Sequence, residues 1–176
     1  PLSLRKEYVR SLLGIAEGLA ALSSVEPVFE PGASDLSRRL GLVHRDVKPD
    51  NIILPPGRPP VLVDFGSLRE MFTSRHYTGV SGTAGYMAPG QRRGEPEDAR
   101  TDVYAVGVLL AEMVTGARAP EAGDDVGALL AGARIPTPLA ELAARCTTAD
   151  PGARPPDARA LAAALERLVD ALDRSP

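Results

Sequence analysis

Apolar residues recur at helical spacing near both ends of the chain. Within residues 4–22 they lie three and four positions apart and form one stripe, at Val9, Leu12, Leu13, Ala16, Leu19 and Ala20. Near the other end, Asp157 is a typical N-cap residue and precedes apolar residues with the same spacing, at Leu161, Leu165, Leu168, Val169 and Leu172. Both patterns predict amphipathic helices that bury one face.

A third segment, residues 101–115, is apolar nearly all round, with Val103, Val106, Val108, Leu109, Leu110, Met113 and Val114. A helix without a polar face is buried on every side, so we expect this segment at the centre of the core. Gly116 is expected to end it. Residues 124–131 and 139–146 show weaker helical patterns.

Short apolar runs between turn residues predict strands at 42–43, 51–54 and 61–63. Residues 67–86 have no sustained periodicity and are expected to form a long loop. The break after the first helix, residues 23–40, is rich in Pro, Gly and Ser and is predicted to be a surface loop insertion. The fold class is therefore mainly α with short β-hairpins, an α+β domain.

Composition narrows the class of partners. With 20 basic and 23 acidic residues the formal net charge is −3, which gives no general case for nucleic acid or an anionic membrane as partner. The chain has a single cysteine, Cys146, which excludes an internal disulfide and suits a reducing, cytoplasmic location. We expect the Cys146 side chain to be a small buried hydrophobic group. The longest apolar run, residues 103–111, is far shorter than the ~20 residues that span a bilayer.

One charged turn carries the candidate chemistry. Asp46, Lys48 and Asn51 lie close together on this turn, and the carboxylate of Asp64 follows the next apolar segment. The Asp46 carboxylate could accept a proton, and the Lys48 ammonium could bind phosphate. The Asn51 amide and the Asp64 carboxylate could bind a metal ion, and this combination indicates phosphoryl transfer. The alternative is a polar turn with solvated charges.

The sequence of this region resembles two motifs of the protein kinase family. Residues 44–51 read HRDVKPDN, like the catalytic loop, and residues 64–66 read DFG, like the metal-binding loop, in the family's order and spacing. Three more stretches resemble the end of the activation segment, the central buried helix and the turn before the last helix, at 83–89, 101–108 and 150–155. The resemblance implies that residues 1–176 are a partial catalytic domain, the large C-terminal lobe of a bacterial Ser/Thr protein kinase.

That resemblance also implies roles for single residues. Asp46 would accept the proton of the substrate hydroxyl, and Lys48 would offset charge on the moving phosphoryl group. Asn51 and Asp64 would hold Mg²⁺, which prefers hard oxygen ligands. Thr83 would bond both Asp46 and Lys48, which points to Ser or Thr as the acceptor residue.

The implied reaction moves the γ-phosphate of Mg-ATP to a hydroxyl of a protein substrate. Ile53 and Val63 would line the underside of the adenine pocket, although both also suit plain core. Lys48, Asn51 and Asp64 would complete the nucleotide-binding residues.

Neighbouring residues would support this site. His44 is expected to pack near Phe65 and to be held by Asp102, and not to act as a base. Arg45 resembles the arginine that reads a phosphorylated activation segment. Candidate phosphorylation sites, each of which also suits an ordinary polar loop residue, are Thr73, Ser74, Thr78 and Ser81.

The chain departs from the family at one buried ion pair. Gly90 stands where the family has the glutamate that pairs with the arginine matching Arg154. A buried charge without its partner is costly, so we expect Arg154 to find another acid, Glu95 or Glu97, or to be more hydrated than usual.

Parts of a complete kinase are missing from the sequence. A kinase also needs a glycine-rich loop and a strand lysine from its small lobe. The chain has no G-x-G sequence, and its only lysines are Lys6, in the first predicted helix, and Lys48. We therefore expect the N-terminal lobe to be absent and the isolated chain to transfer phosphate very poorly.

Two functions remain open. The intact set of candidate site residues favours the catalytic lobe of a Ser/Thr protein kinase. The missing lobe, the insertion and Gly90 favour a truncated or pseudokinase-like lobe that acts as a non-catalytic protein-interaction module.

Overall fold

A computed structural model describes residues 2–24, 42–67, 69–70, 83–119, 126–133 and 135–174. Its α-helices are α1 (Leu2–Ser23), α2 (Pro89–Arg92), α3 (Ala99–Thr115), α4 (Val126–Ala131), α5 (Thr137–Cys146) and α6 (Ala158–Asp173). Its strands are β1 (Leu42–Val43), β2 (Ile52–Ile53), β3 (Val61–Leu62) and β4 (Arg69–Glu70). Short 3₁₀ turns lie at Pro49–Asn51, Phe65–Ser67, Ala84–Tyr86 and Pro151–Ala153.

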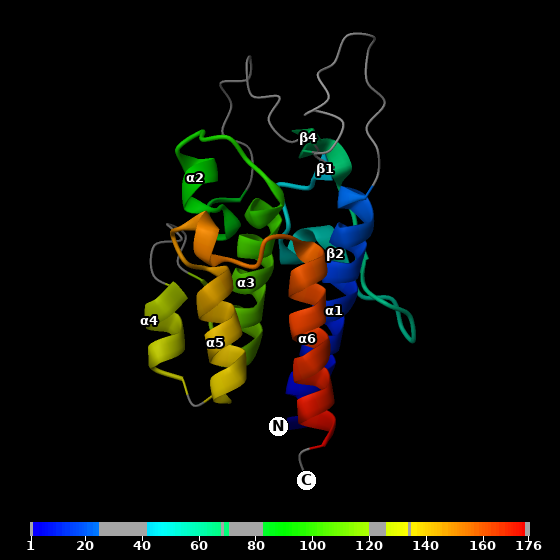
Figure 1. The fold of residues 1–176 in the computed structure, drawn as a ribbon. Coiled ribbons are helices and arrows are strands. Elements are labelled where there is room, and N and C mark those ends of the chain that lie inside the picture. The colour runs from blue at the N-terminus through cyan, green and yellow to red at the C-terminus, as the bar shows by residue number, and fades with distance from the viewer. Residues whose placement is uncertain are drawn as a thin grey trace.

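The helices pack around α3, which lies at the centre of the core. In Figure 1, α1 (blue) and α6 (orange-red) lie side by side, and α4 and α5 lie on the other side of α3. Every residue of α3 from 101 to 111 is buried, which confirms the prediction from its apolar surface. The strands gather at one end of this bundle, and both chain termini lie at the other (Figure 1).

A close approach of α3 and α5 depends on Gly107. A Cβ atom there would collide with the Cβ of Cys146 and would lie 3.0 Å from Cγ2 of Thr147. Cys146 is fully buried against this point, and burial raises the pKa of its thiol to about 12. The prediction that it serves as a small buried hydrophobe is confirmed.

The helix ends follow from capping residues. α3 begins two residues before the predicted start because the Asp98 side chain accepts a hydrogen bond from the Arg100 amide at 2.8 Å. Gly116 ends α3 as predicted, with φ of 73° and its amide donating to the Glu112 carbonyl at 2.7 Å. Asp157 caps α6, also as predicted, by accepting from an amide of its first turn at 2.7 Å.

The strands form two separate antiparallel pairs, β1 with β4 and β2 with β3. In the second pair Ile52 lies opposite Leu62 and Ile53 opposite Val61. Side chains alternate across a strand, so Ile52 and Leu62 pack on the core, whereas Ile53 and Val61 are exposed. The predicted strand 51–54 is shorter in the structure because Asn51 belongs to the preceding 3₁₀ turn.

The prediction of a continuous loop over 67–86 is wrong at both ends. Arg69–Glu70 form β4, which pairs with β1, and Ala84–Tyr86 form a 3₁₀ turn. The pairing of β4 with β1 joins residues that are 26 and 28 positions apart, which local periodicity does not report. Residues 68 and 71–82 of that loop lie outside the described residues, and so do residues 25–40 of the predicted insertion.

No helix in the described part of the chain has both the length and the apolar character needed to cross a bilayer.

Candidate active site

Residues 44–51 connect β1 to β2, and three of their side chains meet Thr83 from a distant segment. Lys48 Nζ lies 2.8 Å from Asp46 Oδ2 and donates to Thr83 Oγ1 at 2.9 Å. Asn51 Nδ2 donates to the Asp46 carbonyl at 2.8 Å and to Asp46 Oδ2 at 3.0 Å. We call these four residues, Asp46, Lys48, Asn51 and Thr83, the catalytic cluster. The predicted contact of Thr83 with both Asp46 and Lys48 is present.

The carboxylate of Asp46 is the centre of the cluster. Besides Lys48 and Asn51, the amide and the hydroxyl of Thr83 donate to Asp46 Oδ1 at 3.2 and 3.3 Å. Burial raises the pKa of Asp46, but the hydrogen bonds from Lys48, Asn51 and Thr83 and the charge of Lys48 outweigh burial. The net result is a pKa below the ordinary value, so Asp46 is ionised at neutral pH.

Asp64 lies beside the cluster at the end of the β2–β3 hairpin. The Val63 amide donates to the Asn51 carbonyl at 2.9 Å, so Asp64 directly follows a residue paired with Asn51. Asp64 is exposed, has a left-handed φ of 65°, and accepts a hydrogen bond from the Gly66 amide at 3.3 Å. Burial lowers the pKa of His44, and the charges of Asp46 and Asp64 oppose only part of that effect, so both carboxylates lie near the same imidazole ring.

These residues fit a Mg²⁺ ion. The amide nitrogen of Asn51 is engaged by Asp46, which leaves the side-chain oxygen of Asn51 for a cation. Among the described residues, no group of three or more His, Cys, Asp or Glu could hold a metal by itself. Mg²⁺ in phosphoryl-transfer sites is commonly held by one or two carboxylates and substrate phosphates, so Asn51 and Asp64 form a suitable protein part.

The two predicted adenine contacts differ in burial. Ile53 is 53% exposed, so it does not serve as core, and its face of the hairpin also carries Val61. Leu54, next in the chain, is 62% exposed. Val63 is half-buried. The result is an apolar surface beside the catalytic cluster.

His44 and Asp102 stabilise the catalytic loop, residues 44–51, by packing and by hydrogen bonds to its backbone. Burial lowers the pKa of His44, and its ring makes an edge contact with Phe65 at 5.3 Å between centroids, as expected of a packing residue. Asp102 accepts hydrogen bonds at 2.8 Å from the backbone amides of His44 and Arg45. Asp102 therefore holds His44 by its backbone. Burial raises the pKa of Asp102 to about 7, and the two amide donors offset only part of that effect.

The predicted acidic partner of Arg154 is wrong. Arg154 is 5% exposed, and its guanidinium donates to backbone carbonyls, to that of Thr148 at 2.9 Å and to those of Arg100 and Ala149 at 3.2 Å. The guanidinium also lies 4.9 Å from the centroid of the Tyr104 ring. The Arg154 guanidinium is therefore bound by backbone carbonyls and the face of an aromatic ring instead of a carboxylate. The sequence analysis considered only acidic partners or greater hydration.

The two acids proposed for Arg154 bind other arginines. Glu95 pairs with Arg93 on the surface at 2.6 Å, and Glu97 pairs with Arg45 at 2.6 Å. Sequence reasoning thus missed Glu97 as a neighbour of the catalytic loop, because only the fold brings residues 45 and 97 together. The candidate phosphorylation sites Thr73, Ser74, Thr78 and Ser81 lie outside the described residues.

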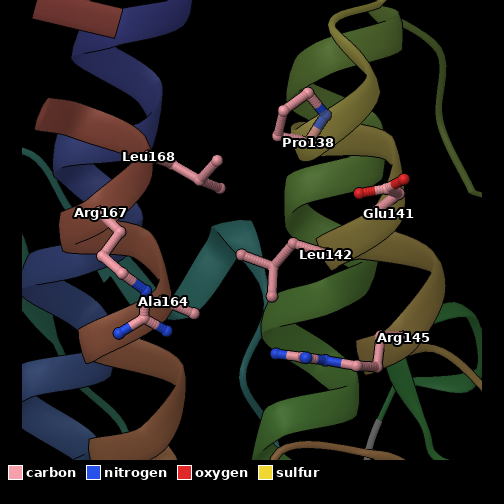
Figure 2. Close-up of a pocket in the computed structure, with 7 residues that line it drawn as sticks. All are labelled: Pro138, Glu141, Leu142, Arg145, Ala164, Arg167 and Leu168. Carbon is pink, nitrogen blue, oxygen red and sulfur yellow. The ribbon is translucent and has the colours of Figure 1, made fainter. Parts of the chain in front are cut away.

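Two surface pockets lie apart from the catalytic cluster. One, of about 260 Å³, lies between α5 and α6. Figure 2 shows Leu142 and Leu168 pointing into the space between these helices, with Arg145 and Arg167 below them in the view. The other lies where the middle of α1 meets the turn between β2 and β3. Neither pocket contains a residue of the cluster.

The fold and the site agree with one protein family. The protein kinase domain matches residues 37–161 of the chain. The chain therefore belongs to the protein kinase family, and its helical fold is that of the large lobe.

Its relatives are serine/threonine kinases of bacteria. Over 170 residues the chain is 37% identical to serine/threonine-protein kinase PknL of Mycobacterium tuberculosis, with 87% of this chain and 41% of PknL covered. Over 101 residues it is 43% identical to the probable serine/threonine-protein kinase PknB of Bifidobacterium longum, with 55% of this chain and 14% of that protein covered. The chain spans less than half the length of these relatives.

Proposed function

We propose that this chain is the catalytic lobe of a Ser/Thr protein kinase. Together with a small lobe it transfers the γ-phosphate of Mg-ATP to Ser or Thr hydroxyls of a protein substrate. The observation that carries the proposal is the Asp46 carboxylate, which receives hydrogen bonds from Lys48, Asn51 and Thr83. In a polar turn with solvated charges, we would not expect three side chains, one of them from the distant residue Thr83, to bind the same carboxylate.

Asp46 is the base or the orienting acceptor for the substrate hydroxyl. Its lowered pKa keeps it ionised at neutral pH, so it can accept the hydroxyl proton as the oxygen attacks the γ-phosphorus. The bond from the γ-phosphorus to its bridging oxygen breaks, and ADP leaves. Lys48, 2.8 Å from Asp46, offsets negative charge on the phosphoryl group, and Thr83 keeps Lys48 in place.

Asn51 and Asp64 would hold Mg²⁺, which would supply positive charge to offset that of the ATP phosphates. The exposed apolar face at Ile53, with Val63 beside it, supports the adenine base. The bond between Lys48 and Thr83 supports Ser or Thr as acceptor. The buried thiol of Cys146 supports a reducing, cytoplasmic location.

The test is phosphotransfer from labelled ATP by the longest natural form of the protein, compared with Asp46→Asn. Since a general base contributes about 10²–10⁴-fold, we expect a loss of that order in a variant that still folds cooperatively, with a modest fall in Tm from the lost ion pair with Lys48. The matched control is Asp50→Asn, an exposed acid on the same turn, which should leave the rate unchanged. Asp46→Asn with the wild-type rate would refute the proposed role of Asp46.

The same assay separates the catalytic function from the interaction-module function. If the longer protein binds Mg-ATP or a protein partner but transfers no phosphate, the non-catalytic function is supported. Turnover by the isolated chain equal to that of the longer protein would contradict the need for a small lobe.

A further inference from the structure

Arg45, directly before Asp46, is held by its backbone amide, its carbonyl and its guanidinium. Its amide donates to Asp102 Oδ1 at 2.8 Å, and its carbonyl accepts from Gln91 Nε2 at 2.8 Å. Its guanidinium donates to Glu97 in the two-bond geometry, from Nε at 2.9 Å and from Nη2 at 2.6 Å. Two of these three partners are acids: the backbone amide binds Asp102, and the guanidinium forms an ion pair with Glu97.

The backbone of Arg45 is strained, with a left-handed φ of 72° that residues with a Cβ rarely adopt. Such a conformation persists only where the surroundings impose it. The Arg45 and Glu97 side chains are 6% and 15% exposed, so water and salt screen their ion pair little. Glu97 thus fixes the direction of the side chain that precedes Asp46, and through it the position of the Asp46 carboxylate.

We propose that Glu97 is a positioning residue for Asp46, acting through Arg45, and that it makes the catalytic loop independent of phosphorylation. This inference rests on the proposed function. A phosphate and a carboxylate both match the guanidinium fork, and here the Nε and Nη2 donors are already given to a carboxylate of the same chain. The negative charge that orders the loop is therefore permanent in this protein.

The alternative is that Glu97 merely adds to the stability of the fold. In that case its loss would loosen the whole chain and not the catalytic loop in particular. The structure offers a matched control, because Glu95, two positions earlier, is an exposed acid that pairs with the exposed Arg93. Glu95→Gln removes the same charge from the same segment without touching Arg45.

Hydrogen exchange on the chain tests the positioning role without requiring phosphotransfer. For Glu97→Gln we expect exchange of the peptide covering residues 42–51 to rise about tenfold or more, because a local opening replaces a held conformation. The peptide covering α6 should be unchanged, and Glu95→Gln should change neither peptide. Unchanged exchange at 42–51, or an equal rise in both peptides, would overturn the proposal.

Phosphotransfer kinetics of the longest natural form of the protein test whether activity is independent of phosphorylation. After phosphatase treatment, confirmed by mass spectrometry, the wild-type rate should stay within about twofold. Glu97→Gln should lower kcat by about ten- to a hundredfold, the range expected for a misplaced catalytic group, with the KM for ATP nearly unchanged. Glu97→Asp, which keeps the charge, should recover part of kcat.

Loss of activity on phosphatase treatment would overturn independence from phosphorylation. Absence of phosphotransfer by the wild type would refute the proposed function, while the exchange result would still decide whether Glu97 positions the loop.

Discussion

The helical core and the catalytic cluster of this chain are stabilised by different forces. The core buries apolar side chains of α1, α3, α5 and α6, a stabilisation that grows with area and has no direction. The cluster consists of polar side chains whose hydrogen bonds to charged groups each contribute about 1.5–3 kcal/mol and set atoms in fixed positions. Changes in the core should therefore lower stability alone, whereas changes in the cluster should lower the rate of phosphotransfer by far more than they lower stability.

The largest effect on stability is expected for Leu161→Ala in α6. Leu161 is fully buried, and truncation of a buried leucine costs about 2–5 kcal/mol of unfolding free energy. Denaturant unfolding monitored by circular dichroism measures this loss. Leu54→Ala, at an exposed position directly after β2, should change the unfolding free energy by less than about 0.5 kcal/mol. Equal losses in both variants would remove the distinction between the two regions.

A smaller loss, about 1–3 kcal/mol, is expected for Gly107→Ala, because the new methyl group overpacks the contact of α3 with α5. The collision is with the Cβ of Cys146, so adding Cys146→Ala should not restore stability. Gly18→Ala is the control with opposite sign. Gly18 lies in α1 with nothing within 4 Å of the added methyl, so alanine should stabilise the helix by up to ~1 kcal/mol.

Asp102 joins the two regions, since it belongs to the buried helix α3 and binds the catalytic loop. Its folded pKa of about 7 lies above the ordinary value of 3.8, so the folded state keeps a proton that the unfolded state releases. Its contribution to stability is therefore full below about pH 4 and falls as pH rises to about 7. The unfolding free energy of the wild type minus that of Asp102→Asn should decrease over this interval. An increase would contradict the raised pKa.

The smallest effect is expected for Asp173→Asn at the exposed end of α6. Asp173 lies 2.7 Å from Arg10 and 3.6 Å from Lys6, and joins α6 to α1 by exposed ion pairs. Such pairs contribute about 0.2–1 kcal/mol. Thermal unfolding should show a small loss at low salt that shrinks at high salt, since exposed charges are screened. A loss comparable to that of Leu161→Ala would show that these exposed ion pairs, and not the apolar core, hold α1 to α6.

Most of the site could be predicted because its residues are neighbours in the chain. Asp46, Lys48 and Asn51 lie within six positions, and their spacing with Asp64 matches a known motif. The role of Thr83 came from the same resemblance. The partners of Arg45 and Arg154 could not be predicted, since Glu97 and the carbonyls around Arg154 reach them only through the fold.

The sequence by itself determined the helices, the helix ends at Gly116 and Asp157, and the order of the catalytic residues, because helical spacing and capping are local. The tertiary structure alone decided that β4 pairs with β1, that Arg154 binds carbonyls, and that Glu97 binds Arg45. These contacts join residues that are distant in sequence or whose polar groups have several possible partners. The packing of the whole chain selects among those partners, and no local pattern records the choice.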